Sequence, residues 1–132
     1  MSYFPADPPD ELSHESALRI IVERHTSRQF GPDALASELF VSRRHLYRRL
    51  SQVGGVAEII GVARAETAAR LLVAQPHVGL HKVLRVAGFG NEESFRAHFR
   101  HTYGVPPRRY RPDLPSLVPD ISLSLAKARV RI

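Results

Sequence analysis

The chain has 132 residues, 43% of them hydrophobic, and carries a formal net charge of +6 at pH 7. This length suits one domain that buries a core of its own. Because the sequence contains no cysteine, disulfides and thiolate metal sites are excluded. The apolar runs are too short to span a membrane, and the first ten residues lack the order of a secretory signal, so we expect a soluble cytoplasmic protein.

The positive charge is concentrated in the middle of the chain. Residues 17–111 hold sixteen Arg or Lys against seven Asp or Glu, a balance of +9, whereas the only charges in residues 1–16 are acidic. Nearly all of these cations are Arg, whose planar guanidinium matches a phosphate and the edge of guanine. The composition therefore favours a nucleic acid as partner, although solvated surface charge would give the same balance.

The N-terminal segment contains no regular element before its first apolar stripe. Residues 1–12 are rich in proline and lack periodicity, which is typical of a mobile tail. We expect a first helix over residues 14–28, with Ser13 as its N-cap. Its buried stripe comprises Leu18, Ile21, Val22 and His25.

A helix-turn-helix pattern follows at about residues 32–50, the first unit. A two-turn helix is expected over residues 32–39, and Ser42 is the N-cap of a second helix over residues 43–50. Leu46 and Leu50 are four apart and share the buried face of this second helix. The opposite, exposed face carries Arg44, Tyr47 and Arg48.

The stretch from Ala57 to Leu72 is a central rod between two similar patterns. Good helix formers dominate it, and its sixteen residues would make a helix about 24 Å long. Its periodicity leaves Arg64 and Arg70 toward water. Gly61 lies inside the rod and should weaken it by about 1 kcal/mol relative to Ala.

The same pattern returns at about residues 80–101, the second unit. A helix over residues 80–87 leads into a Gly-Phe-Gly turn, and Asn91 is the N-cap of the next helix. The second turn is one residue longer than the first. In this internal repeat of about fifty residues, the positions Leu35-Ala36, Val41, Leu46 and Leu50 correspond to Val83-Leu84, Phe89, Phe95 and Phe99.

The end of the chain is less regular. A last short helix is expected over residues 105–111, after a proline start. Residues 113–132 form a C-terminal extension whose alternation changes parity near Ala126, which is compatible with a strand, a helix or a frayed end. We expect a frayed end that is dispensable for folding. Three cations in it could instead touch DNA or a partner: Lys127, Arg129 and Arg131.

Residues 17–111 resemble the DNA-binding domain of AraC-type transcriptional regulators. The most specific stretch is Gly88-Phe89, Phe95, Phe99, Gly104, Pro106-Pro107 and Tyr110-Arg111 at the family's spacing. The resemblance implies an all-α fold of seven helices, in which a central linker helix joins two helix-turn-helix units within residues 13–112. It also implies a protein that activates or represses promoters.

The resemblance implies that the second helix of each unit faces DNA. In the first unit it implies base contacts by Arg44, Tyr47 and Arg48, with Ser42, Arg43 and Arg49 nearer the backbone. In the second unit the corresponding outward positions are Asn91, Glu92, Glu93, Arg96 and Ala97. For the two glutamates, complementing the positive end of the helix dipole is an alternative to reading bases.

The leading hypothesis is a sequence-specific regulator that binds double-stranded promoter DNA without a cofactor. RNA polymerase and a separate effector or dimerisation domain are further candidate partners, and neither residues 1–16 nor 112–132 could hold such a domain. The alternative is a protein-interaction module that has lost DNA affinity. Phe40 favours it, because the resemblance places it where the family often has glycine or another small residue in a left-handed turn, and a bulky residue there costs about 1–2 kcal/mol. Leu84, where the family usually has a small alanine, and the acidic start of the second recognition helix also favour it.

Other classes of function have little support in the sequence. The closely spaced histidine pairs do not reach the three or four ligands that zinc needs. No nucleophile elbow or phosphate-binding loop occurs, so we do not expect an enzyme. RNA binding would need exposed aromatic platforms, which the pattern does not offer. The histidine pairs are His77 with His81 and His98 with His101.

Overall fold

The computed structural model describes the backbone of residues 10–130 and the side chains of residues 14–130. Within that part of the chain there are seven α-helices and no strand, which confirms the all-α class. The elements are α1 (Asp10–Arg24), α2 (Pro32–Glu38), α3 (Arg43–Leu50), η1 (Ser51–Val53), α4 (Val56–Ala74), α5 (Leu80–Val86), α6 (Glu92–Tyr103), η2 (Pro107–Arg109) and α7 (Pro119–Val130), where η denotes a 3₁₀-helix.

The first helix begins earlier and ends earlier than the sequence pattern indicates. Ser13 lies within α1, so its assignment as the N-cap is wrong. The mobile tail expected for residues 1–12 falls outside the described residues, except for residues 10–12, which belong to α1. The helix ends at Arg24, four residues before the expected end, and an irregular segment then leads to α2.

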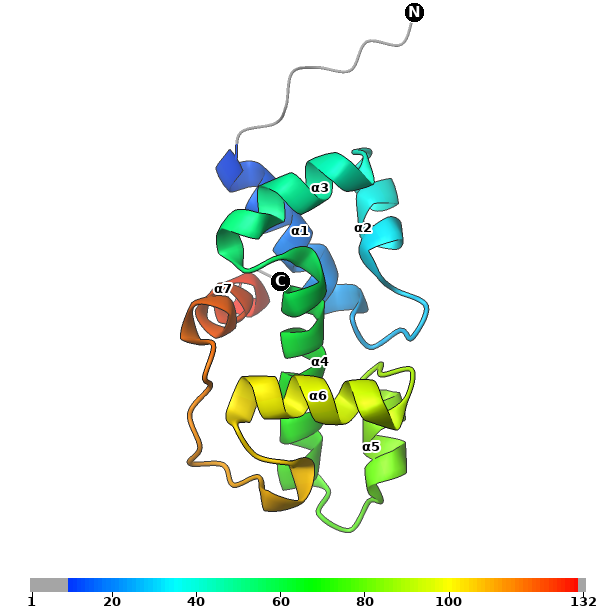
Figure 1. The fold of residues 1–132 in the computed structure, drawn as a ribbon, viewed down its shortest axis with the longest axis vertical. Helices are drawn as coiled ribbons and strands as arrows, with labels where there is room; N and C mark the ends of the chain where they lie inside the picture. Colours follow the sequence, from blue (N-terminus) through cyan, green and yellow to red (C-terminus); the bar gives the residue numbers. More distant parts are fainter. Residues whose placement is uncertain (1–9, 131–132) are drawn as a thin grey trace, which may run out of the picture.

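Helix α4 is the axis of the molecule. It is nineteen residues long and runs between one group made of α1, α2 and α3 and another made of α5 and α6 (Figure 1). The core divides along it into two clusters, because its first half packs with the first group and its second half with the second group. Buried residues therefore occur on several sides of α4, which is typical of a helix surrounded by other elements.

Arg64 of α4 differs from the expectation that it faces water. Its Nε donates to the carbonyl oxygen of His25 at 2.8 Å, and its Nη2 donates to that of Phe30 at 2.8 Å and to that of Ser27 at 3.1 Å. These carbonyls belong to the irregular segment between α1 and α2, where no helix satisfies them. Arg64 therefore fastens this segment to the central helix, whereas Arg70 is exposed, as expected.

Gly61 has a packing role that the sequence pattern does not reveal. A Cβ atom there would lie 2.1 Å from Nδ1 of His98, a residue of α6. The imidazole of His98 rests on the backbone of α4 and stacks over Phe89, with 6.1 Å between the ring centres. The glycine that weakens the helix in isolation thus permits the close approach of α4 and α6.

The expectation of a frayed C-terminal end is wrong. Residues 119–130 form α7, which packs against α1 and α4 and buries Ile121, Leu125 and Ala128. These residues follow helical spacing, whereas a strand-like alternation breaks near Ala126. Arg129 donates to Oε1 of Glu66 at 2.8 Å, so its guanidinium is engaged within the fold. The expected helix over residues 105–111 is reduced to η2, so the seventh α-helix is α7.

Candidate nucleic-acid interface

The first helix of each unit ends in the same type of turn, although the second turn is one residue longer. After α2, the amide of Val41 donates to the carbonyl of Ala36 at 3.1 Å, and Phe40 has a φ of +57°. After α5, the amide of Phe89 donates to the carbonyl of Leu84 at 2.9 Å, and Gly88 has a φ of +99°. Each turn is a helix end closed by a left-handed residue and a hydrogen bond back to the preceding helix.

The predicted N-caps of α3 and α6, Ser42 and Asn91, are confirmed. The hydroxyl oxygen of Ser42 accepts from the amide of His45 at 3.0 Å at the start of α3. The side-chain oxygen of Asn91 accepts from the amide of Ser94 at 2.7 Å at the start of α6. Each cap fixes where its helix begins and therefore which side chains face outward.

Helix α3 presents a basic face. Its apolar residues Leu46 and Leu50 are buried, whereas the predicted site residues Ser42, Arg43, Arg44, Tyr47 and Arg48 are exposed. Arg49 differs from them because it is half-buried, and its carbonyl accepts a hydrogen bond from His14 Nε2 at 3.0 Å. The backbone at Arg49 is thus in contact with α1.

Arg43 is held by its neighbours. Its Nη2 donates to the hydroxyl of Tyr47 at 3.4 Å, and its Nε lies 3.1 Å from Oδ1 of Asp33. The guanidinium also lies over the ring of Tyr47, 5.5 Å from the ring centre. The hydrogen bond to Tyr47 and the charge of Asp33 raise the pKa of Arg43, which keeps the side chain cationic.

Helix α6 places its predicted site residues outward as well, over an aromatic core. Phe95 and Phe99 are buried, whereas Asn91, Glu92, Glu93, Arg96 and Ala97 are exposed. Arg96 Nη2 donates to Glu92 Oε1 at 2.5 Å, so two positions that the sequence treats separately form one ion pair. This pairing follows from their spacing of four residues on one helix.

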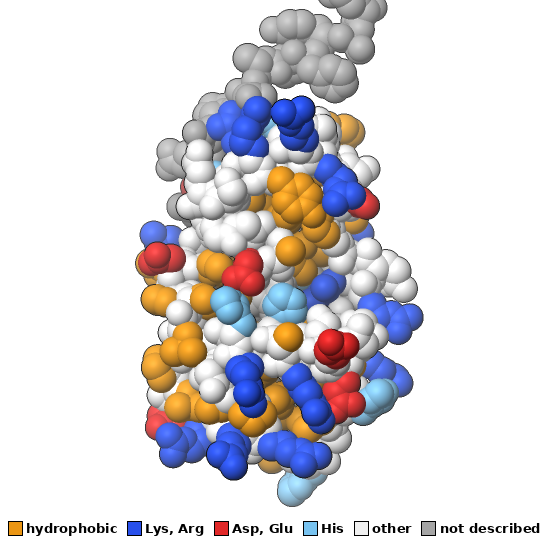
Figure 2. All heavy atoms as spheres, viewed as in Figure 1, with side chains coloured by type: hydrophobic (Ala, Val, Ile, Leu, Met, Phe, Trp, Pro, Cys, Tyr) orange, Lys and Arg blue, Asp and Glu red, His pale blue; other side chains and the backbone are white. Residues whose placement is uncertain are grey.

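The two outward surfaces lie on one side of the molecule. Helices α3 and α6 both cross the front of the view in Figure 1, with α4 behind α6. In the same view, Lys and Arg side chains gather near the two ends of the visible surface, and acidic and His side chains lie between them (Figure 2). The arrangement presents two cationic regions to a partner that approaches from this side.

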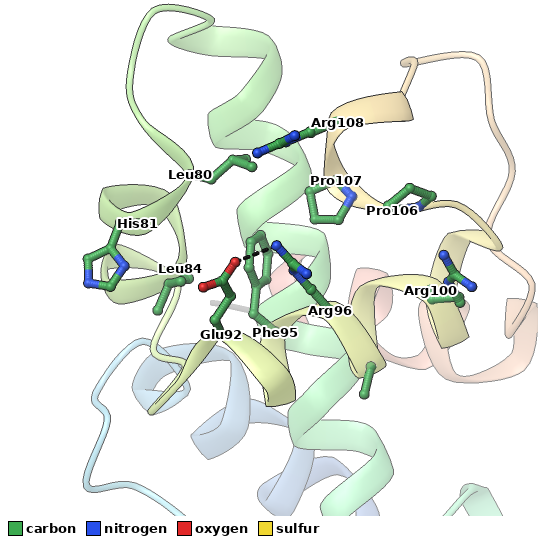
Figure 3. A pocket seen from close by; sticks show the side chains of 11 residues that line it. Leu80, His81, Leu84, Glu92, Phe95, Arg96, Arg100, Pro106, Pro107 and Arg108 are labelled. Carbon is green, nitrogen blue, oxygen red and sulfur yellow. Dashed lines mark hydrogen bonds and ion pairs between the residues drawn. The ribbon is translucent and has the colours of Figure 1, made fainter.

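A groove of about 540 Å³ lies beside α6, bordered by α5 and η2 (Figure 3). Its cations include Arg100 and Arg108, which the sequence analysis did not assign to the site. Arg100 is four residues after Arg96, so helical spacing could have found it. Arg108 lines the groove because the chain folds back after α6 and places η2 beside it, which no local sequence spacing indicates. The other lining residues are Leu80, His81, Leu84, Glu92, Phe95, Arg96, Ala97, Pro106 and Pro107.

Neither a metal centre nor a membrane span was found in the described part of the chain. Among its side chains, no group of three or more His, Cys, Asp or Glu could hold a metal ion. No helix within residues 10–130 is both long enough and apolar enough to cross a bilayer.

Comparisons with known proteins place this geometry in context. A family model described as a helix-turn-helix domain matches residues 35–113, more than half of the chain. The probable transcriptional regulator LumQ of Photobacterium leiognathi is 28% identical over 90 residues, which cover 67% of this chain and 36% of LumQ. The chain therefore matches about a third of the length of that relative. No solved structure matches.

Proposed function

This chain belongs to the AraC-type helix-turn-helix family, and on that premise we propose that it reads double-stranded DNA sequence-specifically and regulates transcription. The family is one of DNA-binding regulators, so the proposal concerns how the DNA is read. The observation that carries it is that α3 and α6 lie on one side of the molecule with their polar faces exposed. Helices so presented suit the major groove of B-DNA.

In the first unit, we assign base reading to Arg44, Tyr47 and Arg48. Their exposure supports this role, because an Arg can donate two hydrogen bonds to guanine and the Tyr ring and hydroxyl add further contacts. Ser42 and Arg43 stand at the start of α3 and suit backbone contacts. Arg49 is assigned a backbone contact as well, and its partial burial limits that contact to the edge of the interface.

In the second unit, Glu92 and Arg96 act as a pair. The carboxylate fixes the guanidinium, so an acceptor and a donor fork stand side by side on α6. Glu can accept from the cytosine amine and Arg can donate to guanine, so the pair suits neighbouring cytosine and guanine bases. The oxygen of Asn91 is used by its cap, which leaves its amine for DNA. Glu93 and Ala97 complete the outward surface.

The partners beyond DNA follow from the family. RNA polymerase is the expected target of an activator at a promoter. A separate effector or dimerisation domain is the expected source of regulation, since this chain matches only 36% of LumQ. Both partners belong to the proposal.

Selection of bound duplexes from a random pool, followed by salt titration, tests this function. The account predicts one enriched, non-palindromic site, because α3 and α6 differ in sequence. It also predicts a steep salt dependence, with a slope of about −0.9 for each phosphate contacted. A pool that yields no enriched sequence, with no salt-dependent affinity, would contradict it.

One observation favours the alternative of a protein-interaction module. Phe40 has 84% of its surface exposed while its backbone is in the left-handed region. A strained and exposed aromatic residue is a candidate contact for a partner. The same selection separates the two functions, because an interaction module without DNA affinity would enrich no duplex.

A further inference from the structure

The groove beside α6 has an apolar floor and a cationic rim. Apolar atoms of Leu80, Leu84 and Pro107 line it, and its arginines come from two elements (Figure 3). Arg96 and Arg100 stand on α6, whereas Arg108 reaches toward Leu80 from η2. The groove is therefore a concave site on the same exposed surface of α6 that carries Ala97 and the Glu92–Arg96 pair.

The charge of the groove is distributed unequally. Its single carboxylate, Glu92, is bound to Arg96 at 2.5 Å. Within the described side chains, no acidic group is ion-paired with Arg100 or Arg108, and both are exposed. The net positive charge of the groove thus resides on these two guanidinium groups, which approach it from different elements.

We propose that this groove binds the DNA backbone, with Arg100 and Arg108, which belong to different elements, each holding a phosphate. The inference rests on the proposed DNA binding and adds a site to it. Each guanidinium group matches the oxygens of a phosphodiester through planar, charge-assisted hydrogen bonds. The apolar floor suits the deoxyribose attached to such a phosphate. A phosphate held beside α6 fixes the register in which Glu92 and Arg96 meet the bases.

This site changes how the second unit contributes to binding. On α6 alone, the negative charges of Glu92 and Glu93 balance the positive charges of Arg96 and Arg100. This balance predicts that α6 discriminates between base sequences but adds little DNA affinity. Arg108 lies outside that helix, and Glu92 is occupied by Arg96. The second unit therefore holds backbone phosphates in addition to discriminating between bases.

Two neighbouring arginines of η2 provide a matched comparison. Arg108 and Arg109 are both exposed, but only Arg108 lines the groove. In the full chain, with a duplex obtained by selection, Arg108→Ala and Arg100→Ala should each weaken binding about tenfold for every sequence. Each should also reduce the salt slope by about 0.9, whereas Arg109→Ala should stay close to the wild type. Thermal unfolding should be unchanged in all three variants, since the side chains are exposed.

A scan with neutral methylphosphonates then locates the phosphate held by Arg108. Each phosphate of the duplex is replaced in turn, and wild type and Arg108→Ala are compared at every position. At one position beside the half-site of α6, the replacement should lower the DNA affinity of the wild type about tenfold. The affinity of Arg108→Ala should not fall further at that position. If the affinity losses caused by the methylphosphonate and by Arg108→Ala add up at every position, the proposal is wrong. Competition by inorganic phosphate that depends on Arg108, without any such position, would assign the groove to a free anion and also overturn it.

The outcomes separate this site from the function on which it rests. If Arg44→Ala weakens binding while Arg108→Ala behaves like Arg109→Ala, the groove proposal is wrong and DNA binding stands. If the wild type binds no duplex, both are wrong.

Discussion

The two helix-turn-helix units end their first helices with a left-handed residue, but they place very different residues at that position. Phe40 of the first turn projects into solvent, with 84% of its surface exposed. At the equivalent position of the second turn, a Cβ atom on Gly88 would lie 2.3 Å from the carbonyl oxygen of His25. A left-handed backbone alone therefore does not require glycine. A side chain is tolerated at a modest cost where space is open, and it is excluded where another backbone lies close.

The interiors of the units also differ. The first is packed with aliphatic residues such as Leu35, Leu46 and Leu50, in a cluster that also includes α7. The second contains a series of contacting aromatic rings. The ring centres of Phe89 and Phe95 are 5.1 Å apart, and those of Phe99 and Tyr110 are 5.5 Å apart. Equivalent backbones are thus stabilised by different contacts, so equivalent substitutions should have unequal effects.

Replacing Gly88 should destabilise the protein most. Gly88→Ala forces a Cβ against the carbonyl of His25 in a backbone with a φ of +99°. The strain and the clash should together lower the free energy of unfolding by about 4 kcal/mol, measured by urea denaturation. Gly90→Ala is the matched control, because a Cβ there meets only Arg28 side-chain atoms at 3.9 Å or more. Equal stabilities of the two variants would contradict the close approach.

The cluster of the first unit should depend on the C-terminal helix. Leu125 is fully buried between α7 and its neighbours, so Leu125→Ala should lower the free energy of unfolding by about 3 kcal/mol. Leu123 lies on the same helix with 56% of its surface exposed. Leu123→Ala should therefore change stability by less than about 0.5 kcal/mol. If thermal unfolding does not distinguish these variants, α7 does not contribute to this core.

The contact between α1 and α4 should be sensitive to acid through His25. Burial lowers the pKa of His25, with a further contribution from the charges of Arg129 and Arg70. The unfolded chain then takes up a proton below about pH 6.5, while the folded chain resists it, so stability falls as the pH decreases. The free energy of unfolding should drop by about 1 kcal/mol between pH 6.5 and pH 5.

The imidazole of His25 connects α1 to α4, since its Nδ1 donates to the carbonyl of Ile21 at 2.8 Å and its Nε2 accepts from Thr67 at 2.6 Å. His98 has a pKa that burial also lowers, so it adds to the same trend. His25→Gln should reduce the pH dependence of urea denaturation, whereas His81→Gln, at an exposed position, should not. If stability instead rises toward pH 5, the pKa of His25 is not lowered in the folded protein.

Replacing Phe40 in the first turn should raise the stability of the protein slightly. Phe40→Gly removes the left-handed strain but adds the entropy cost of glycine, so stability should rise by about 0.5–1 kcal/mol. Phe40→Ala keeps the strain and should show no such gain in the same thermal unfolding experiment. If Phe40→Gly is instead destabilising, the ring makes contacts that matter for folding, and the two turns differ less than described.

Features fixed by neighbouring residues could be predicted from the sequence. The caps Ser42 and Asn91 were found because each depends on a few adjacent residues, whereas the left-handed position of Phe40 was expected from the family resemblance. The outward faces of α3 and α6 followed from helical spacing, except that spacing alone did not show the partial burial of Arg49. The contacts of these faces with DNA remain predictions.

Features fixed by distant residues could not be predicted in this way. Arg64 turns inward because carbonyls 34 to 39 positions away need donors, and Gly61 is required by the ring of His98. Helix α7 is stabilised by burial against α1, which lies at the opposite end of the chain. Arg108 reaches the groove through the path of η2. Each of these depends on tertiary packing, which local propensity does not encode.

A major-groove footprint on the selected duplex shows whether both units contact DNA. Two recognition helices on one rod should protect two patches on one face of the DNA, about 34 Å or one helical turn apart. The double change Glu92→Ala, Glu93→Ala should raise non-specific affinity and flatten base preference in the second patch alone, because two carboxylates that repel phosphates are lost. A single protected patch, or a double variant with unchanged affinity and preference, would contradict the claim that both units read DNA.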